Sequence, residues 1–575
     1  MRTPSHATGP EHALMRKRRR LVTRWWFWTA VGVLAIVVAG GSWVGVRGLQ
    51  AKAELESAQT LVSQLKAQAL DQNIPGAATT LETLRAHSAK AQELTNDQIW
   101  RAAEIVPVLG RNLTVVRELA AVTNTVVTDA IDPLLQVASM ITPASLAPKD
   151  GAIDLAPFQQ AVAPVTAANT AIRSAVAMVD AIDTSGTLSQ LPAAKKKLGG
   201  LLTDVAPMMQ TLQTVLPMLP AAMGAEVPRN YVLMFQNDAE ARALGGTALS
   251  FALVTMDNGK IELTKTVPAG FGNFDHYATS VIPAPDGVEG IYADTFGMFI
   301  ANATVRPSFV SAAQITSVMW EQQFGLVPDG VISIDPVVLG YILRATGPIP
   351  LSSGDVLTDK TIVPLLLNEV YQRYNSGNNR ADNVAQDAVY GEAVAATFDH
   401  LSTGKFDAKI LLGSIVQGWD ERRLLVWSAH EDEQAQFAKA GLNGELPQSD
   451  TTTDRVGVYF QDAVGSKMSY YLTQSVQLSQ AACRTDGRDN YRISVDLTNT
   501  APANALQALS LSILGQSERA GLEPGDQRMI VMLYAPPGSQ IVGATAGGAA
   551  IQLEALHDTD YPVGKVRVEF APGAT

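Results

Sequence analysis

The feature that most constrains this chain is an uncharged stretch near its N-terminus. Residues 25–46 contain no charged side chain, and they follow a basic cluster at residues 16–20. At about 1.5 Å of rise per residue, a helix of this length extends roughly 33 Å, enough to cross the hydrocarbon core of a bilayer. Trp25 and Trp28 stand at one end and Trp43 at the other, as in the aromatic belts of membrane interfaces. The sequence therefore predicts a transmembrane helix.

The charge around this stretch predicts its orientation. Residues 1–24 form a strongly basic tail, whereas the whole chain has a net charge of −12. Because positive charge stays on the cytoplasmic side, we expect the N-terminus inside and the bulk of the chain outside the cytoplasm. The alternative is a cleaved signal peptide. Its apolar segment is about 7–15 residues and precedes a small-residue cleavage site, and neither is evident around residues 46–50. A retained single-pass anchor in the lipid bilayer is the prediction.

Composition narrows the class of partner and of site. Since the residues after the tail are strongly acidic, we expect no general nucleic-acid surface there. The chain has a single cysteine, Cys483, which excludes an internal disulfide and a cysteine-rich zinc site.

The 575 residues are too many for one hydrophobic core, so several domains are expected. Residues 48–222 are rich in alanine and leucine at helical spacing, which predicts a helical stalk. Its clearest helices are expected at residues 112–131, 155–182 and 194–216.

Residues 228–430 alternate between strand and helix patterns, which predicts a layered α/β core domain. It opens with a buried strand at residues 231–235, and a polar loop is expected at residues 236–242. A second apolar run leads into the Asp257-Asn258-Gly259-Lys260 sequence, a strong hairpin signal. Residues 330–334 read as another buried strand.

From residue 444 to 575 the pattern changes to short alternating strands, which predicts a C-terminal β-sandwich of immunoglobulin-like architecture. The expected fold class is therefore α+β multidomain. Its parts are a basic cytoplasmic tail (1–24), a transmembrane helix (25–46), an extracytoplasmic helical region (48–222), the α/β core (228–430) and the sandwich.

The first α/β hairpin holds the best candidate site. Asp238, Glu240 and Arg242 can form a metal or phosphate cluster, with Arg242 as the anion clamp. The alternative is a loop whose acids and arginine pair with each other in water. Gly245 and Gly246 can bring backbone N–H groups close to an anion, although tight packing explains them as well. The sequence contains no known nucleophile, nucleotide-binding or metalloprotease motif, so no catalytic residue is assigned.

Three segments resemble an uncharacterised bacterial envelope family, the domain-of-unknown-function family 4012, which is common in actinobacteria. They are NYVLMFQNDAEARALGGTALSFALVTMDNGKIEL, PDGVISIDPVVLGYILRATGPIPL and GVYFQDAVGSKMSYYLTQSVQL. The resemblance implies a membrane-anchored extracytoplasmic protein of the cell envelope, without an assigned activity.

A more distant resemblance is to the LytR-CpsA-Psr phosphotransferases, which attach lipid-linked glycans to peptidoglycan. It rests on the order of strand, hairpin and the DGVISIDPVVLGYILRATGPI segment. Those enzymes hold a pyrophosphate with arginines and a magnesium ion with aspartates. Arg380 and Asp382 are the counterparts of the last of these motifs, but the arginine expected after the hairpin is replaced by Pro268-Ala269-Gly270. The resemblance thus implies a shared core with a thinned catalytic set, and Mg²⁺ only if the chain is such an enzyme.

Two functions remain open from the sequence. The first is an anchored envelope protein that binds or transfers a glycan on its polyprenyl-pyrophosphate carrier, or contacts peptidoglycan. The second is a non-catalytic envelope assembly or adhesion scaffold. The first predicts that Arg242, Arg380 and an acid such as Asp238 converge around a pocket that holds a lipid tail, and the second does not.

Overall fold

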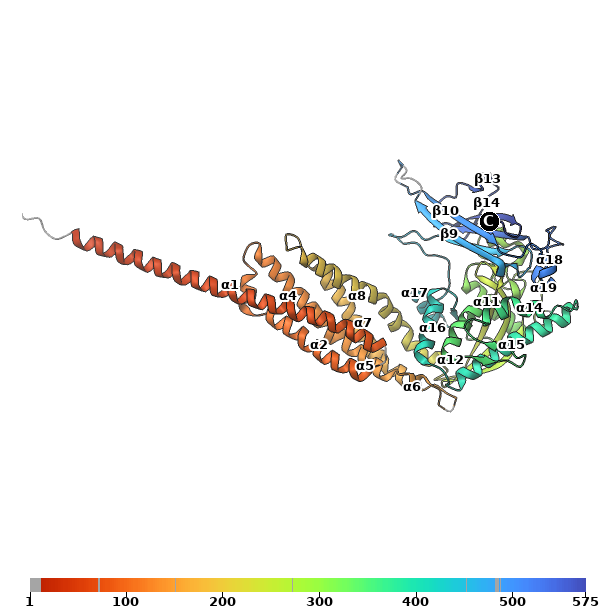
Figure 1. Ribbon diagram of the computed structural model, residues 1–575, viewed down its shortest axis with the longest axis horizontal. Coiled ribbons are helices and arrows are strands. Elements are labelled where there is room, and N and C mark those ends of the chain that lie inside the picture. The colour runs from red at the N-terminus through yellow and green to blue at the C-terminus, as the bar shows by residue number, and fades with distance from the viewer. Residues whose placement is uncertain are drawn as a thin grey trace, which may run out of the picture. The chain divides into compact units, whose positions relative to one another are not determined.

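The computed structural model describes residues 12–70, 73–149, 151–270, 272–450, 452–480, 485–486 and 488–575. The chain divides into two compact units (Figure 1). The first contains residues 1–142 and 160–213, and the second contains residues 143–159 and 214–575. The fold is mixed α and β, as the sequence predicts.

The first unit is a bundle of helices. Its elements are α1 (His12–Leu70), α2 (Ile74–Thr95), α3 (Gln98–Ala103), α4 (Leu109–Thr125), the π-helical η1 (Val126–Ile131), α5 (Asp132–Met140), α7 (Ala156–Ala181) and α8 (Gln190–Val215). The helices predicted at residues 112–131, 155–182 and 194–216 are thereby confirmed. Leu65 of α1 packs with Leu81 and Leu84 of α2, and Val115 of α4 packs with Val179 of α7. Apolar residues at helical spacing thus bury one face of each helix.

Helix α1 is unusually long, with 59 residues. Its apolar part begins at Trp25, and only 6% of the most apolar window is buried. A helix of this length and composition fits a single-pass membrane anchor. Helix α7 is also long and apolar enough to cross a membrane, but 39% of its window is buried. Ala161, Val165 and Ala168 of α7 lie inside the bundle, so α7 is better explained as a core helix.

The second unit is built on a five-stranded sheet with the order β3-β2-β1-β4-β7. These strands are β1 (Arg229–Arg242), β2 (Gly245–Asp257), β3 (Lys260–Pro268), β4 (Gly330–Ile334) and β7 (Leu425–Ser428). β1 runs parallel to β4, whereas the other neighbours are antiparallel. The β2–β3 turn is the predicted one, and both Asn258 and Gly259 have positive φ angles. Two such residues make the tight turn that matches the twist of a hairpin.

Both faces of β1 are covered. Val232 and Met234 pack on one side with α11 (Phe309–Phe324), and Leu233 and Phe235 pack on the other with α12 (Pro336–Thr346). A strand buried on both faces explains the continuous apolar run in the sequence. The predicted polar loop at residues 236–242 is wrong, because β1 continues through it to Arg242. Register shifts after Phe235 and after Asn237 let this polar stretch stay paired with β2.

The C-terminal residues form further antiparallel sheets. A four-stranded sheet has the order β14-β15-β11-β8, and β9 pairs with β10 and β12 with β13. These strands are β8 (Gly457–Asp462), β9 (Leu472–Gln480), β10 (Tyr491–Asn499), β11 (Gln527–Tyr534), β12 (Ala544–Ala546), β13 (Ala549–Ile551), β14 (Glu554–Asp558) and β15 (Tyr561–Phe570). A short pair, β5 (Ile349–Pro350) and β6 (Val356–Leu357), lies earlier in the chain.

The stretches 228–430 and 444–575 share their hydrophobic cores. Tyr534 and Val563 belong to the cluster that contains Val232, and Met468 and Ile513 belong to the cluster that contains Leu233. The C-terminal strands thus pack within the same compact unit as the five-stranded sheet.

The remaining helices of this unit surround the sheets. They are α6 (Pro143–Leu146), η2 (Leu216–Met218), α9 (Leu219–Ala222), α10 (Val288–Tyr292), η3 (Ala293–Thr295), η4 (Ile300–Asn302), α13 (Ile362–Pro364), η5 (Leu365–Glu369), α14 (Val370–Arg373), α15 (Asn379–Ser402), α16 (Ala408–Asp420), α17 (Glu431–Ala440), η6 (Met468–Tyr471), α18 (Ala505–Ala508) and α19 (Leu511–Leu514).

Candidate functional site

The candidate site lies where the parallel strands β1 and β4 end. Phe235 of β1 is in register with Ile334 of β4, so Asp238 and Asp335 follow at the same edge of the sheet. The carboxyl ends of parallel strands are where α/β sheets commonly place their ligands. Asp335 also caps α12, since its Oδ1 accepts a hydrogen bond from the Val338 N–H at 2.8 Å. Aspartate is a favourable cap, and Pro336 after it suits the first position of a helix.

Arg423 joins the two carboxylates. Its Nη1 lies 2.5 Å from Asp335 Oδ2 and 3.4 Å from Asp238 Oδ2, and its Nε lies 3.2 Å from Glu421 Oε2. The side chain of Asp335 is 6% exposed, that of Asp238 25% and that of Arg423 37%. Arg423 therefore contacts all three carboxylates and is more open to solvent than either aspartate.

The neighbouring charge of Asp335 affects Asp238. Burial, and next the charge of Asp335, raise the pKa of Asp238 well above its ordinary range, although Arg423 opposes the shift. Two carboxylates that contact one guanidinium repel each other, and Arg423 offsets this repulsion.

A second charged group lies further along β1. Arg242 Nη2 donates to Glu240 Oε1 at 2.6 Å, and Lys467 Nζ lies 3.6 Å from Glu240 Oε2. Burial opposes ionisation of Glu240, but Lys467 and Arg242 outweigh it and lower its pKa. Lys467 also lies 4.8 Å from the centre of the Tyr371 ring, a cation–π contact. The acid and the two cations form a compact, mostly buried cluster.

Arg242 retains one unused donor in this cluster. Its side chain is 10% exposed, its Nη1 donates to the Ala241 carbonyl, and its Nε is buried without a hydrogen-bond partner. Asp387 of α15 lies near Lys467, and burial raises the pKa of Asp387 to about 6 although Lys467 opposes the shift. An unsatisfied guanidinium N–H beside a second cation is suited to an anion.

Neutral polar side chains complete the end of β1. Gln236 Nε2 donates to Ser333 Oγ at 2.7 Å, and Asn237 Nδ2 donates to the Tyr371 hydroxyl at 2.7 Å. These partners explain why the stretch is buried as a strand: its polar groups are satisfied by residues far away in sequence.

The two glycines are explained by packing. The Gly246 N–H donates to Gln236 Oε1 at 2.9 Å, and a methyl group on Gly246 would lie 2.2 Å from the Asn237 carbonyl carbon. Gly245 has a φ of +140°, and a methyl group there would lie 2.7 Å from Gln236 Oε1. The close approach of β1 and β2 thus requires glycine at both positions.

Arg380 and Asp382 occupy the first turn of α15. Arg380 is exposed. Asp382 accepts hydrogen bonds from the Ser376 N–H at 2.9 Å and from its hydroxyl at 2.7 Å, and these bonds lower the pKa of Asp382. Asp382 therefore holds its own loop. In the part of the chain that the structure describes, no hydrogen bond or ion pair joins Arg380 or Asp382 to Asp238, Glu240 or Arg242.

The donor set does not fit a magnesium ion. The Arg423 guanidinium already lies where a cation would meet both Asp238 and Asp335. Among the described residues, no three His, Cys, Asp or Glu side chains are grouped so as to hold a metal. Hard divalent cations require several oxygen ligands that are not already neutralised.

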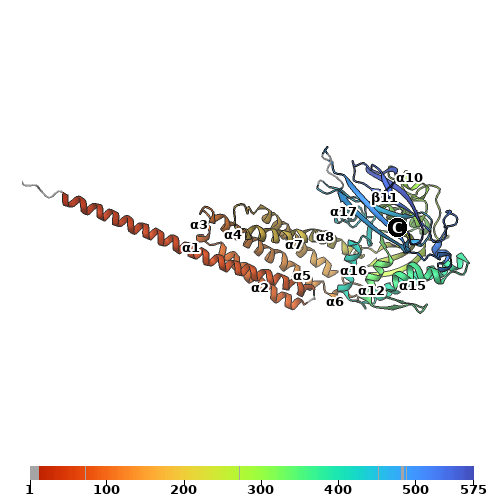
Figure 2. The ribbon, with the colours of Figure 1, turned by 45° about the horizontal axis from the view of Figure 1, so that its top comes forward.

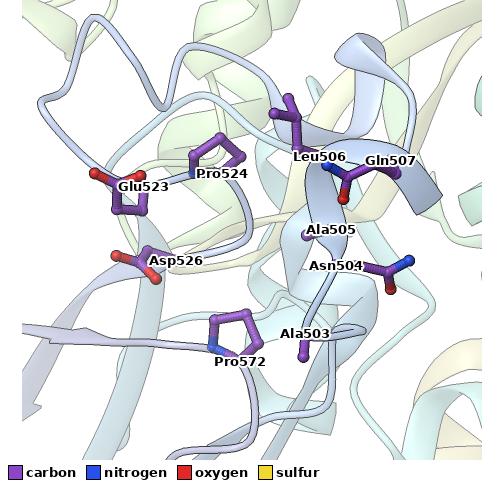
Figure 3. A pocket seen from close by; sticks show the side chains of 9 residues that line it. All are labelled: Ala503, Asn504, Ala505, Leu506, Gln507, Glu523, Pro524, Asp526 and Pro572. Atoms are coloured by element: carbon purple, nitrogen blue, oxygen red, sulfur yellow. The ribbon is translucent and has the colours of Figure 1, made fainter.

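Two hollows of the described surface are not lined by the candidate residues. The larger, of about 360 Å³, is an open depression with Ala503 and Leu506 on one side and Glu523 and Asp526 on the other (Figure 3). The smaller, of about 110 Å³, is lined by Ala243, the neighbour of Arg242. It is below the roughly 300–1,000 Å³ typical of small-molecule sites.

Sequence reasoning found Asp238, Glu240 and Arg242 but missed the basic partners Arg423 and Lys467. Lys467 lies in the third family-like segment, GVYFQDAVGSKMSYYLTQSVQL, which was the available signal for it. Arg423 stands two residues before β7, and no pattern marked it.

Comparison with known proteins shows a match to a protein family that has no assigned function. Residues 226–371 match the model of DUF4012, a protein family of unknown function. The match covers about a quarter of the chain, from just before β1 to Tyr371. It includes Asp238, Glu240, Arg242 and Asp335, and it ends before Arg423 and Lys467. No curated protein matches the chain significantly.

Proposed function

We propose that the protein is a single-pass membrane protein whose two folded units lie outside the cytoplasm, where it acts as a non-catalytic binding or assembly component of the cell envelope. The observation that carries the proposal is α1. Its uncharged, exposed part begins at Trp25 directly after a basic segment. Such a helix is stable only in lipid, and the basic side remains in the cytoplasm.

The state of the charged groups supports a non-catalytic role. Asp238 and Asp335 are neutralised by Arg423, and Glu240 is neutralised by Arg242 and Lys467. A general base or a nucleophile must be free to react with its substrate, whereas these carboxylates are already engaged in ion pairs.

Alkaline carbonate extraction of cell membranes, followed by the intact mass of the extracted protein, tests the anchor. We expect the full 575-residue chain to stay in the pellet. A shorter chain in the supernatant, cut near residue 47, would show a cleaved signal sequence instead. Protease added to intact protoplasts should degrade residues 48–575 and leave the N-terminal tail protected.

A second candidate function is binding of a polyprenyl-pyrophosphate-linked glycan, favoured by the unpaired Nε of Arg242 beside Lys467. Charge-assisted contacts of this kind stabilise binding by about 1.5–3 kcal/mol each. The distant resemblance to the LytR-CpsA-Psr enzymes supports the same ligand class.

Binding of a short polyprenyl pyrophosphate to the detergent-solubilised chain tests this candidate. Arg242→Gln should weaken binding roughly tenfold or more, whereas Arg373→Gln, which removes an arginine paired with Asp355, should not. Because the carboxylates are neutralised by arginine, EDTA should leave the affinity unchanged. Equal affinities for the two variants would exclude the β1 cluster as the site.

A further inference from the structure

The turn between α3 and α4 exposes a cluster of apolar side chains. Ile105 is 83% exposed, Val108 75%, Leu109 64% and Val106 46%. No polar side chain stands among these positions, since the fifth residue is Pro107. An isolated exposed leucine needs no explanation, but a continuous apolar turn usually contacts something.

This turn is a firmly built structure. The Leu109 N–H donates to the Pro107 carbonyl, and the Gly110 N–H donates to the Val106 carbonyl, both at 2.8 Å. Val108 has a φ of +70°, which is rare for a β-branched residue. Gly110 packs so closely that a methyl group there would lie 1.8 Å from the Glu104 carbonyl oxygen. The backbone thus holds its apolar side chains outward in a strained conformation.

The turn lies beside the end of the predicted membrane span. Asp97, which caps α3, pairs with Arg47 at 2.6 Å and accepts a hydrogen bond from Trp43 Nε1 at 3.3 Å. Trp100 of α3 contacts Gly48, at 3.7 Å from a methyl group built there. These contacts fix α3, and hence the turn that follows it, at the level where the uncharged stretch of α1 ends. In Figure 2, α3 lies next to α1 at the end of the bundle from which α1 projects.

Other exposed groups at this end of the bundle have matching chemistry. Leu188, between α7 and α8, is 64% exposed, and its N–H donates to Asn112 Oδ1 of α4 at 2.8 Å. Ile99 of α3 is 46% exposed. Arg101 and Arg111 flank the apolar turn in sequence. Exposed apolar side chains flanked by arginines and a tryptophan are complementary to a bilayer surface. The apolar groups match the acyl chains, and the guanidinium groups match the lipid phosphates.

We propose that this end of the bundle, formed by residues 99–111 and Leu188, rests in the leaflet at the Trp43 end of the α1 span. The inference depends on the proposed anchoring by α1 and adds a second lipid contact to it. The occupant is the lipid surface because the patch adjoins the span itself: the ion pair and hydrogen bond of Asp97 join the start of α3 to the end of the span. Two contacts fix the tilt and rotation of the bundle on the membrane, which a single span does not.

Quenching by brominated lipid tests the proposal on the full-length chain in phosphatidylcholine vesicles. In a Cys483→Ser background, Ile105→Cys or Leu188→Cys carries an environment-sensitive fluorophore. The matched control is Met208→Cys, which is 63% exposed. It lies on α8 about 27 Å beyond the start of that helix at 1.5 Å per residue. Vesicle flotation is measured on every sample.

We expect the probes at 105 and 188 to lose about half of their fluorescence or more in brominated lipid, since interfacial segments lie roughly 5–10 Å deep. The probe at 208 should be unaffected. Chains that float with the vesicles but show equal, weak quenching at all three positions would overturn the inference and leave the α1 anchor intact. Chains that fail to float would overturn the anchor as well.

Discussion

At the scale of single residues, the end of β1 shows how carboxyl groups are accommodated in the fold by pairing with basic side chains of the same protein. Asp238 lies in β1, Asp335 precedes α12 and Arg423 precedes β7, and Arg423 pairs with both aspartates. The same holds for Glu240 with Arg242 and Lys467. Buried pairs of this kind are costly to break although they contribute little net stability, so they are better tested by removing one partner.

Asp335 permits such a test. Asp335→Ala removes the cap of α12 and the closest partner of Arg423, and we expect a loss of about 2 kcal/mol in the free energy of unfolding. The control is Asp407→Ala, because exposed Asp407 caps α16 through the Ile410 N–H without an ion pair. That change should cost about 1 kcal/mol or less. Urea unfolding of both variants provides the comparison, and equal losses would contradict the role given to Arg423.

Asp387 predicts a pH dependence of stability. Its folded-state pKa of about 6 lies above the ordinary value of 3.8. The folded chain therefore binds the proton more tightly than the unfolded chain, and this contribution is lost as the pH rises through about 6. Asp387→Asn removes the loss, so its stability relative to the wild type should increase by roughly 2 kcal/mol between pH 4 and pH 8. Urea unfolding of the two chains at each pH provides the measurement.

At the scale of elements, local signals were predictable and long-range ones were not. The Asn258-Gly259 turn follows from backbone preferences of two adjacent residues, and the buried core of β1 follows from its apolar run. The continuation of β1 through Asn237 depends instead on Tyr371, 134 residues away. The charged cluster depends in the same way on Arg423, which is 185 residues from Asp238. Such partners cannot be recognised from a local pattern.

The close approach of β1 and β2 predicts the effect of adding a methyl group. Gly246→Ala would overlap the backbone of Asn237, which no side-chain rotation relieves, so we expect a loss of about 2 kcal/mol or more. Gly413 lies within α16 with no atom within 4 Å of an added methyl group. Gly413→Ala should therefore stabilise the protein, by roughly 0.5–1 kcal/mol. Thermal unfolding of the two variants should shift in opposite directions.

At the scale of the whole molecule, residues 228–430 and 444–575 depend on each other. The sequence predicts an α/β domain followed by a β-sandwich. In the structure, residues of both stretches belong to the same two hydrophobic clusters. The buried pair of Arg306 with Asp558, at 2.8 Å, also joins the two stretches. The pattern of a strand shows which of its residues face a core, but not which other sheet covers that face. The shared cores could therefore not be inferred from the sequence.

A chain ending after Asn443 tests this dependence. It lacks the residues that cover Val232 and Leu233, and it leaves Arg306 buried without its carboxylate. Loss of a buried partner alone costs about 3–5 kcal/mol. We expect the shortened chain to lose cooperative unfolding and to bind hydrophobic dyes, whereas a full-length Asp355→Asn chain, which loses an exposed pair, should behave as the wild type. A cooperatively folding short chain would support an independent domain.

Helix α1 continues without interruption from before Trp25 to Leu70, so no joint separates the part proposed to span the membrane from the part that packs against α2. A straight rod of 59 residues is about 88 Å long at 1.5 Å per residue. If the proposed span tilts as the bilayer around it thins or thickens, the whole of that tilt must pass to the helices that pack against the C-terminal half of α1.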